Sequence, residues 1–95
     1  LEWPSPACEG RLGACHGLEL PFVFDTLATT TGALGLTGPN PPQALADRIH
    51  GLWVQFARSG ELPWAPFDAN ARPVYQFARG EVQREAELPA AAIVP

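Results

Sequence analysis

NPPQALADRIHGLWVQFARSG, residues 40–60, is the stretch of this sequence that decides the fold. Its apolar side chains recur at spacings of three and four residues: Leu45, Ile49, Leu52, Trp53 and Phe56. This spacing puts them on one face of an α-helix, with polar side chains opposite. Those polar side chains are Asp47, Arg48, Gln55 and Arg58. The pattern predicts an amphipathic helix whose apolar face needs a large surface to pack on.

The ends of this helix also have sequence signals. Asn40 is a residue type that caps helices, and Pro41 suits the first helical position, where a missing N–H has no cost. Gln43 lies three residues after Asn40, as in a capping box. Gly60 is a typical C-terminal stop. We therefore expect the helix to run from Pro41 to Ser59.

Beyond this helix, residues 61–71 are rich in proline and turn-forming residues and predict a loop. Residues 72–77 alternate in the manner of a strand of about six residues. Val82 can start a second short strand after a turn at Arg79-Gly80. We expect the tail, residues 90–95, to be frayed.

The half of the chain before the helix is more irregular. Residues 1–18 predict a loop with a strand end at Leu1–Trp3, and residues 28–40 predict an irregular, mobile loop. Residues 19–27 predict a short helix with Pro21 in its first turn. Its expected apolar face is Leu20, Val23, Phe24 and Leu27. A strand at residues 22–24 is the alternative.

Length and composition limit the classes of protein. Ninety-five residues allow one small domain, and a net charge of −4 argues against a nucleic-acid binder. No apolar stretch is long enough to span a membrane, and no secretory leader is visible, which favours the cytoplasm. The sequence has no methionine and starts with leucine, so we expect a piece of a longer chain. With 46% hydrophobic and 17% charged residues, we also expect apolar faces made for a partner.

The reactive and charged residues give few other leads. Cys8 and Cys15 are expected to be ordinary thiols, and a small-loop disulfide is the alternative. Neither histidine has a partner at zinc-ligand spacing, so we expect no metal and no cofactor. The carboxylates at Asp25, Asp47 and Asp68 are expected to be solvated or capping groups, and His50 a residue at the border of the apolar face.

His16 is the one residue whose surroundings suggest chemistry. Small residues precede it and Gly17 follows it, so its imidazole can project from a loop into a cleft. Histidine is the usual general base near neutral pH. A loop histidine with no chemical role is the alternative, and composition by itself favours that alternative.

The run LGACHGLELPFVF, residues 12–24, resembles the catalytic-histidine segment of the type-B carboxylesterases, which include the para-nitrobenzyl esterases. Three later segments resemble the same family, in the same order: residues 53–60 its W-x-x-F-A-x-x-G helix end, residues 64–68 its tryptophan turn, and residues 72–77 its R-x-x-x-x-F strand. The resemblance covers residues 12–77, most of the chain.

This resemblance implies that residues 1–95 are the C-terminal portion of an α/β-hydrolase fold, comprising the histidine loop, the amphipathic helix and an edge strand, and incomplete without the rest. Such enzymes use a Ser–Glu (or Asp)–His triad in that chain order. His16 would be the catalytic histidine. Ser5 and Ser59 both lack the glycines of a nucleophile elbow, so the nucleophile belongs to a missing N-terminal part. The substrate of the whole enzyme would be a small-molecule ester.

The same resemblance gives roles to residues near His16. Gly13, Ala14 and Gly17 would shape its loop, and Glu19 would be a buried structural acid beside the site. Pocket or core positions would be Phe22, Phe24 and Leu27, with core packing preferred for at least two of them. We expect the isolated chain to be inactive and to form a homo-oligomer that hides apolar surface. The alternatives are a stand-alone interaction module built on the exposed helix face and a small α+β structural domain unrelated to esterases.

Overall fold

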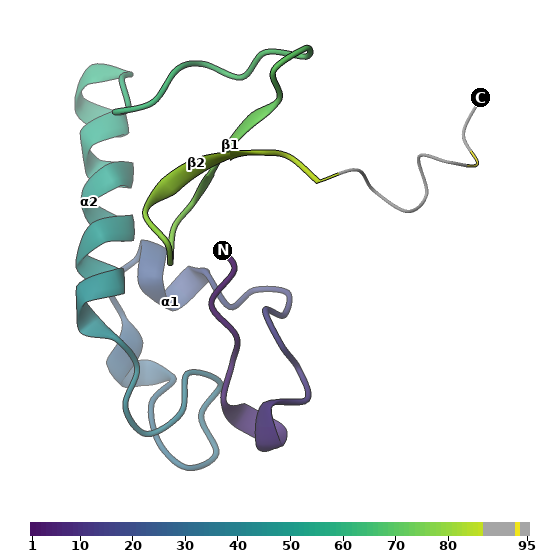
Figure 1. Cartoon of the computed structure of the whole chain (residues 1–95). Helices are drawn as coiled ribbons and strands as arrows, with labels where there is room; N and C mark the ends of the chain where they lie inside the picture. The colour runs from purple at the N-terminus through teal and green to yellow at the C-terminus, as the bar shows by residue number, and fades with distance from the viewer. Residues whose placement is uncertain (87–92, 94–95) are drawn as a thin grey trace.

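A computed structural model describes residues 1–86 and residue 93 of the chain. The predicted fraying of residues 90–95 lies outside the described residues, apart from residue 93. The described residues form two α-helices, two 3₁₀ turns and one β-hairpin (Figure 1). The helices are α1 (Leu20–Val23) and α2 (Gln43–Ser59), the strands β1 (Pro73–Gln76) and β2 (Glu81–Arg84), and the 3₁₀ turns Ala7–Gly10 and Leu27–Thr29.

Helix α2 confirms the predicted amphipathic helix but begins two residues later than predicted. Pro42, with ψ 100°, is the residue before the first helical turn, and no side chain caps it. The reason is the Pro-Pro pair: a residue that precedes proline is kept out of the helical region, so Pro41 cannot start the helix. The Gln43 amide donates to Asp25 and Asp47 instead of forming the predicted capping box with Asn40. Gly60 ends the helix as predicted, at φ 72° with its N–H on the carbonyl of Phe56.

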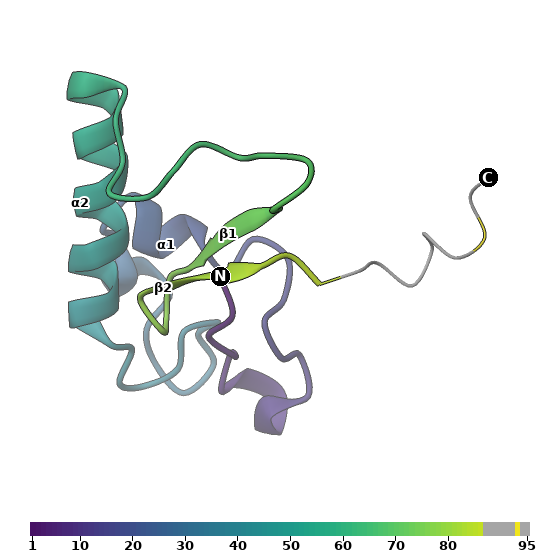
Figure 2. The same ribbon diagram turned by 45° about the horizontal axis from the view of Figure 1, so that its top comes forward.

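The hydrophobic core forms where α1 meets the first half of α2. Its buried members are Phe22, Leu27, Leu45, Ala46 and Ile49. Trp3 packs its ring edge against Phe22, with the centroids 5.3 Å apart. Both views show α2 at one side of the molecule, with α1 and the hairpin lying on the same side of it (Figures 1 and 2). The second half of α2 extends beyond this core, which leaves Trp53 51% and Phe56 47% exposed.

Helix α1 lies within the predicted segment, but its buried face differs from the prediction. Phe22 is fully buried, whereas Leu20 is 52% and Phe24 65% exposed. The predicted face assumed a helix continuing to Leu27, yet α1 makes one turn and stops before Asp25, which has φ 53°. Leu27 still reaches the core because a separate 3₁₀ turn begins there.

The hairpin confirms both predicted strands, with shorter bounds. β1 and β2 are antiparallel, and Tyr75 lies opposite Val82. β1 starts after Arg72, whose φ of 51° breaks the extended backbone. The Arg72 guanidinium forms a salt bridge with the Glu85 carboxylate at 2.9 Å. The Trp64 ring stacks on Tyr75 with the centroids 4.2 Å apart.

The predicted strand end at Leu1–Trp3 is not formed with any of the described residues, and a side chain holds this segment instead. The Glu2 carboxylate accepts hydrogen bonds from the N–H groups of Ala78 (2.7 Å) and Arg79 (3.0 Å) in the hairpin turn. Burial by itself raises the pKa of the Glu2 carboxyl. The hydrogen bonds from the N–H groups of Ala78, Glu2 and Arg79 outweigh burial and hold this pKa below its ordinary value. The N-terminal segment is thus tethered to the hairpin by a charged acceptor.

We expect Glu2→Gln to lower the free energy of unfolding at pH 7 by about 1 kcal/mol, since the amide nitrogen cannot accept one of the two bonds. Because folding lowers the pKa of this carboxyl, its stabilisation is present above the unfolded pKa and is lost as the pH falls through the folded pKa. Urea unfolding at pH 7 and at about pH 3 should therefore show the difference between the two proteins shrinking in acid. An equal difference at both pH values would contradict the tether.

The loop between α1 and α2 is irregular, as predicted, and is held by hydrogen bonds within itself. Thr37 is buried and contacts Thr30 through their hydroxyls, 2.9 Å apart. Thr30 donates its hydroxyl proton to Leu27, so Thr37 is the donor of the shared bond. Within the described residues, no helix is long and apolar enough to cross a membrane. These elements are compatible with the expected portion of an α/β-hydrolase, which stays a prediction.

Candidate active-site histidine and its surroundings

His16 lies on an exposed turn that is held on both sides. On the N-terminal side, the Gly13 carbonyl accepts hydrogen bonds from Ser5 N–H (2.8 Å) and Cys15 N–H (3.0 Å). On the C-terminal side, Leu18 is 1% exposed, and its N–H bonds to the Cys15 carbonyl. The backbone around His16 is thus fixed while its imidazole faces solvent.

The glycines on either side of His16 have backbone conformations that suit glycine. Gly13 has φ 58° and Gly17 has φ 79°, in the left-handed region where a side chain is strained. Ala14 lies between Gly13 and Cys15 and is exposed. Ala14 lies in a bend before His16, and Gly17 lies in the turn that begins at His16.

Glu19 differs from its expected role as a buried acid. Its side chain is exposed, and its backbone carbonyl accepts the N–H groups of Phe22 and Val23 at the start of α1. Among the described residues, no side chain forms a hydrogen bond to the His16 ring. A triad acid for His16 would therefore have to come from outside residues 1–86.

The three candidate pocket residues fall into two groups. Phe22 and Leu27 are core residues, in agreement with the preference for core packing. Phe24 instead borders a surface hollow between α1 and α2, which it shares with His50 and Trp53. His50 is half-buried at the border of the apolar face, as predicted, with Nδ1 2.8 Å from the Val23 carbonyl. A carbonyl can only accept, so this ring nitrogen carries a proton, and His50 links α2 to α1.

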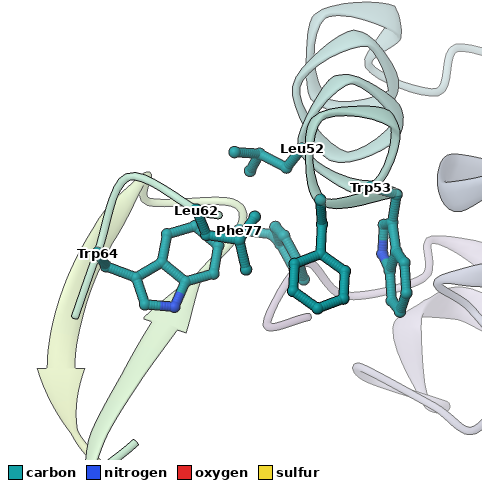
Figure 3. Close-up of a pocket in the computed structure, with 6 residues that line it drawn as sticks. Leu52, Trp53, Leu62, Trp64 and Phe77 are labelled. Atoms are coloured by element: carbon teal, nitrogen blue, oxygen red, sulfur yellow. The ribbon is translucent and has the colours of Figure 1, made fainter. Parts of the chain in front are cut away.

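An aromatic groove lies between α2 and the hairpin (Figure 3). It has a volume of about 180 Å³ and is lined by Leu52, Trp53, Phe56, Leu62, Trp64 and Phe77. In the close-up, Leu52 and Trp53 project from α2, while Trp64 and Phe77 approach from the hairpin side. Trp53 and Phe56 are predicted to need a large packing surface, and both face this groove. Both side chains stay about half exposed there.

The remaining reactive groups are structural or free. Cys8 is exposed and Cys15 half-buried, and both are free thiols, so the alternative of a disulfide is not formed. The N–H groups of Ala71 and Asn70 donate to the Asp68 carboxylate, and these two bonds lower the pKa of that carboxyl below its ordinary value. The described residues contain no cluster of three metal-ligating side chains.

The sequence does not predict the structural roles of Ser5 and Glu2. Ser5 lacks the glycines of a nucleophile elbow, yet it is buried and hydrogen-bonded to two loops. Glu2 lies in the predicted strand end, yet its carboxylate accepts hydrogen bonds from the hairpin turn. The hydrogen bond from Ser5 to Leu36 spans 31 residues of chain, and that from Ala78 to Glu2 spans 76. No local sequence pattern encodes contacts over such separations.

Comparison with known proteins points to a hydrolase. No family model matches the chain. The chain is similar to phenmedipham hydrolase from Pseudarthrobacter oxydans, with 35% identity over 74 residues. The match covers 70% of this chain and 15% of the relative, so the chain spans a small part of that protein's length. That relative is named as a hydrolase, in keeping with the resemblance found in the sequence.

Proposed function

We propose that this chain is the histidine-bearing segment of a type-B serine carboxylesterase and that His16 is its general base. The observation that supports this most directly is the similarity to a hydrolase over a segment of 74 residues, together with the four esterase-like motifs in their family order. The geometry is compatible with the role. His16 is exposed on a turn whose backbone is fixed on both sides. A general base that meets groups from another part of the protein requires both this exposure and this fixed position.

In this proposal His16 acts on a serine that belongs to the rest of the hydrolase. The imidazole takes the serine hydroxyl proton as the oxygen attacks the ester carbonyl, and returns that proton to the departing alcohol, which leaves an acyl-enzyme. A water molecule then attacks the acyl group with His16 again as the base, and the serine recovers its proton. An acidic residue from the same missing part orients the second ring nitrogen.

The proposal predicts that the isolated 95-residue chain does not turn over esters, because it lacks the nucleophile and the oxyanion hole. We expect a rate no higher than that of an equal concentration of free imidazole, measured with an unactivated ethyl ester in a pH-stat. The full polypeptide that carries the segment should hydrolyse the same ester. Ester turnover by the pure 95-residue chain, abolished by His16→Ala, would overturn this part of the proposal.

A second candidate function, a stand-alone interaction module, is favoured by one observation, the half-exposed aromatic groove. The size of the polypeptide in its native cells separates the two candidates. Mass spectrometry or blotting should find this sequence in a protein of hydrolase length, several times longer than 95 residues. A band near 10 kDa would instead favour the module and make His16 a surface residue.

A further inference from the structure

We infer that Ser5 is a positioning residue for His16: it fixes the histidine turn and connects it to the loop between α1 and α2. This inference rests on the proposed role of His16 as general base. Ser5 is 1% exposed and lies eleven residues before His16, in a segment with no helix or strand. Neither its burial nor its contacts are required by the mechanism proposed above.

The first step is the contact of Ser5 with the histidine turn. Its backbone N–H donates to the Gly13 carbonyl at 2.8 Å. The same carbonyl accepts the Cys15 N–H, so one oxygen atom fixes the backbone directly before His16. Any displacement of Ser5 therefore changes the direction of the Gly13 carbonyl and, with it, the turn that carries the imidazole.

The second step is what holds Ser5 itself. Its hydroxyl donates to the Leu36 carbonyl at 2.6 Å and accepts the Ala7 N–H at 3.1 Å. A buried hydroxyl with both a donor and an acceptor bond has one favoured orientation. The hydroxyl thus joins the N-terminal segment to a loop 31 residues further along the chain.

The third step is the close fit between these two loops. A Cβ atom on Gly38 would lie 2.4 Å from the Pro6 ring, so this ring packs too closely on the Gly38 backbone to leave room for a side chain there. The two segments lie side by side in both views (Figures 1 and 2). Ser5 therefore links the position of this loop to the turn of His16.

The test compares Ser5→Ala with Thr37→Val. Each variant loses one buried hydroxyl and is expected to lower the melting temperature, but the Thr37 hydroxyl bonds to Thr30 and does not contact the histidine turn. In the 95-residue chain, Ser5→Ala should accelerate amide hydrogen exchange at Cys15 at least tenfold, because the Cys15 N–H donates to the Gly13 carbonyl that Ser5 also binds. Thr37→Val should leave the exchange of this amide within twofold of the original. In the full hydrolase, Ser5→Ala should lower kcat at least tenfold with KM within twofold, because a small misplacement of a base is costly. Thr37→Val should leave both constants within twofold.

Equal exchange of the Cys15 amide in the two variants, or kcat within twofold in Ser5→Ala, would overturn the inference and leave Ser5 a core residue. The exchange experiment needs no activity, so it remains valid if the full polypeptide does not hydrolyse esters. In that case the proposed function fails, while faster exchange in Ser5→Ala still supports the control of the turn by Ser5. Ser5→Thr keeps the hydroxyl and should keep the exchange of the Cys15 amide slow.

Discussion

Replacing His16 with glutamine in the full hydrolase should lower kcat for ester hydrolysis at least ~10³-fold, with a much smaller change in KM. The His16 side chain is exposed and forms no hydrogen bond to the described residues, so its replacement removes little stability. A large loss of kcat would therefore report lost proton transfer. Steady-state kinetics with an unactivated ester, alongside a melting curve for each protein, makes the measurement.

His50→Gln is the matched control for this experiment. It makes the same chemical change at the other histidine of the chain, whose ring is half-buried and bonded to the Val23 carbonyl. We expect it to reduce stability by about 1 kcal/mol through the lost link between α1 and α2 and to keep kcat within about threefold. If both variants kept the original activity, the role proposed for His16 would be contradicted. If both lost activity equally, the loss would report helix packing and not proton transfer.

The sequence predicts the regular elements of this chain well because they follow from local periodicity. The spacing of Leu45, Ile49 and Phe56 predicts a helix, and alternation predicts the hairpin strands, since both patterns involve residues close in sequence. The errors occur where one residue overrides the pattern. Pro42 removes its predecessor from the helix, and the positive φ of Asp25 ends α1 after one turn.

The sequence singles out a candidate histidine, whose catalytic role stays a prediction, but not the contacts that hold its loop. Gly13 and Gly17 have positive φ on either side of an exposed His16, a conformation that glycine adopts without strain. Glu19 is exposed where the resemblance implied burial, since burial depends on what covers a side chain. Ser5 could not be assigned a role, because its hydroxyl finds its acceptor only once two distant loops meet.

The exposed aromatic groove has a consequence for the isolated chain as large as that of His16 for the full enzyme. We expect the 95-residue chain to self-associate through this groove, where the rest of the hydrolase would otherwise pack. Phe56 lines the groove and is 47% exposed, so Phe56→Gln should weaken association at least ~30-fold. In a symmetric dimer each substitution acts twice, and two losses of about 1 kcal/mol each give a change of that size.

Phe67→Gln is the control, because Phe67 is 62% exposed and does not line the groove. It makes the same change in side chain at a ring that is more exposed than Phe56, and the dissociation constant should stay within about threefold. Sedimentation equilibrium over a range of concentrations measures all three proteins. A monomeric original chain at millimolar concentration, or equal weakening by both variants, would contradict the groove as the contact surface. Weakening by Phe56→Gln but not Phe67→Gln would instead mark the groove as the face that meets the missing part of the hydrolase, since the surface that docks a partner is the one that pairs when the partner is absent.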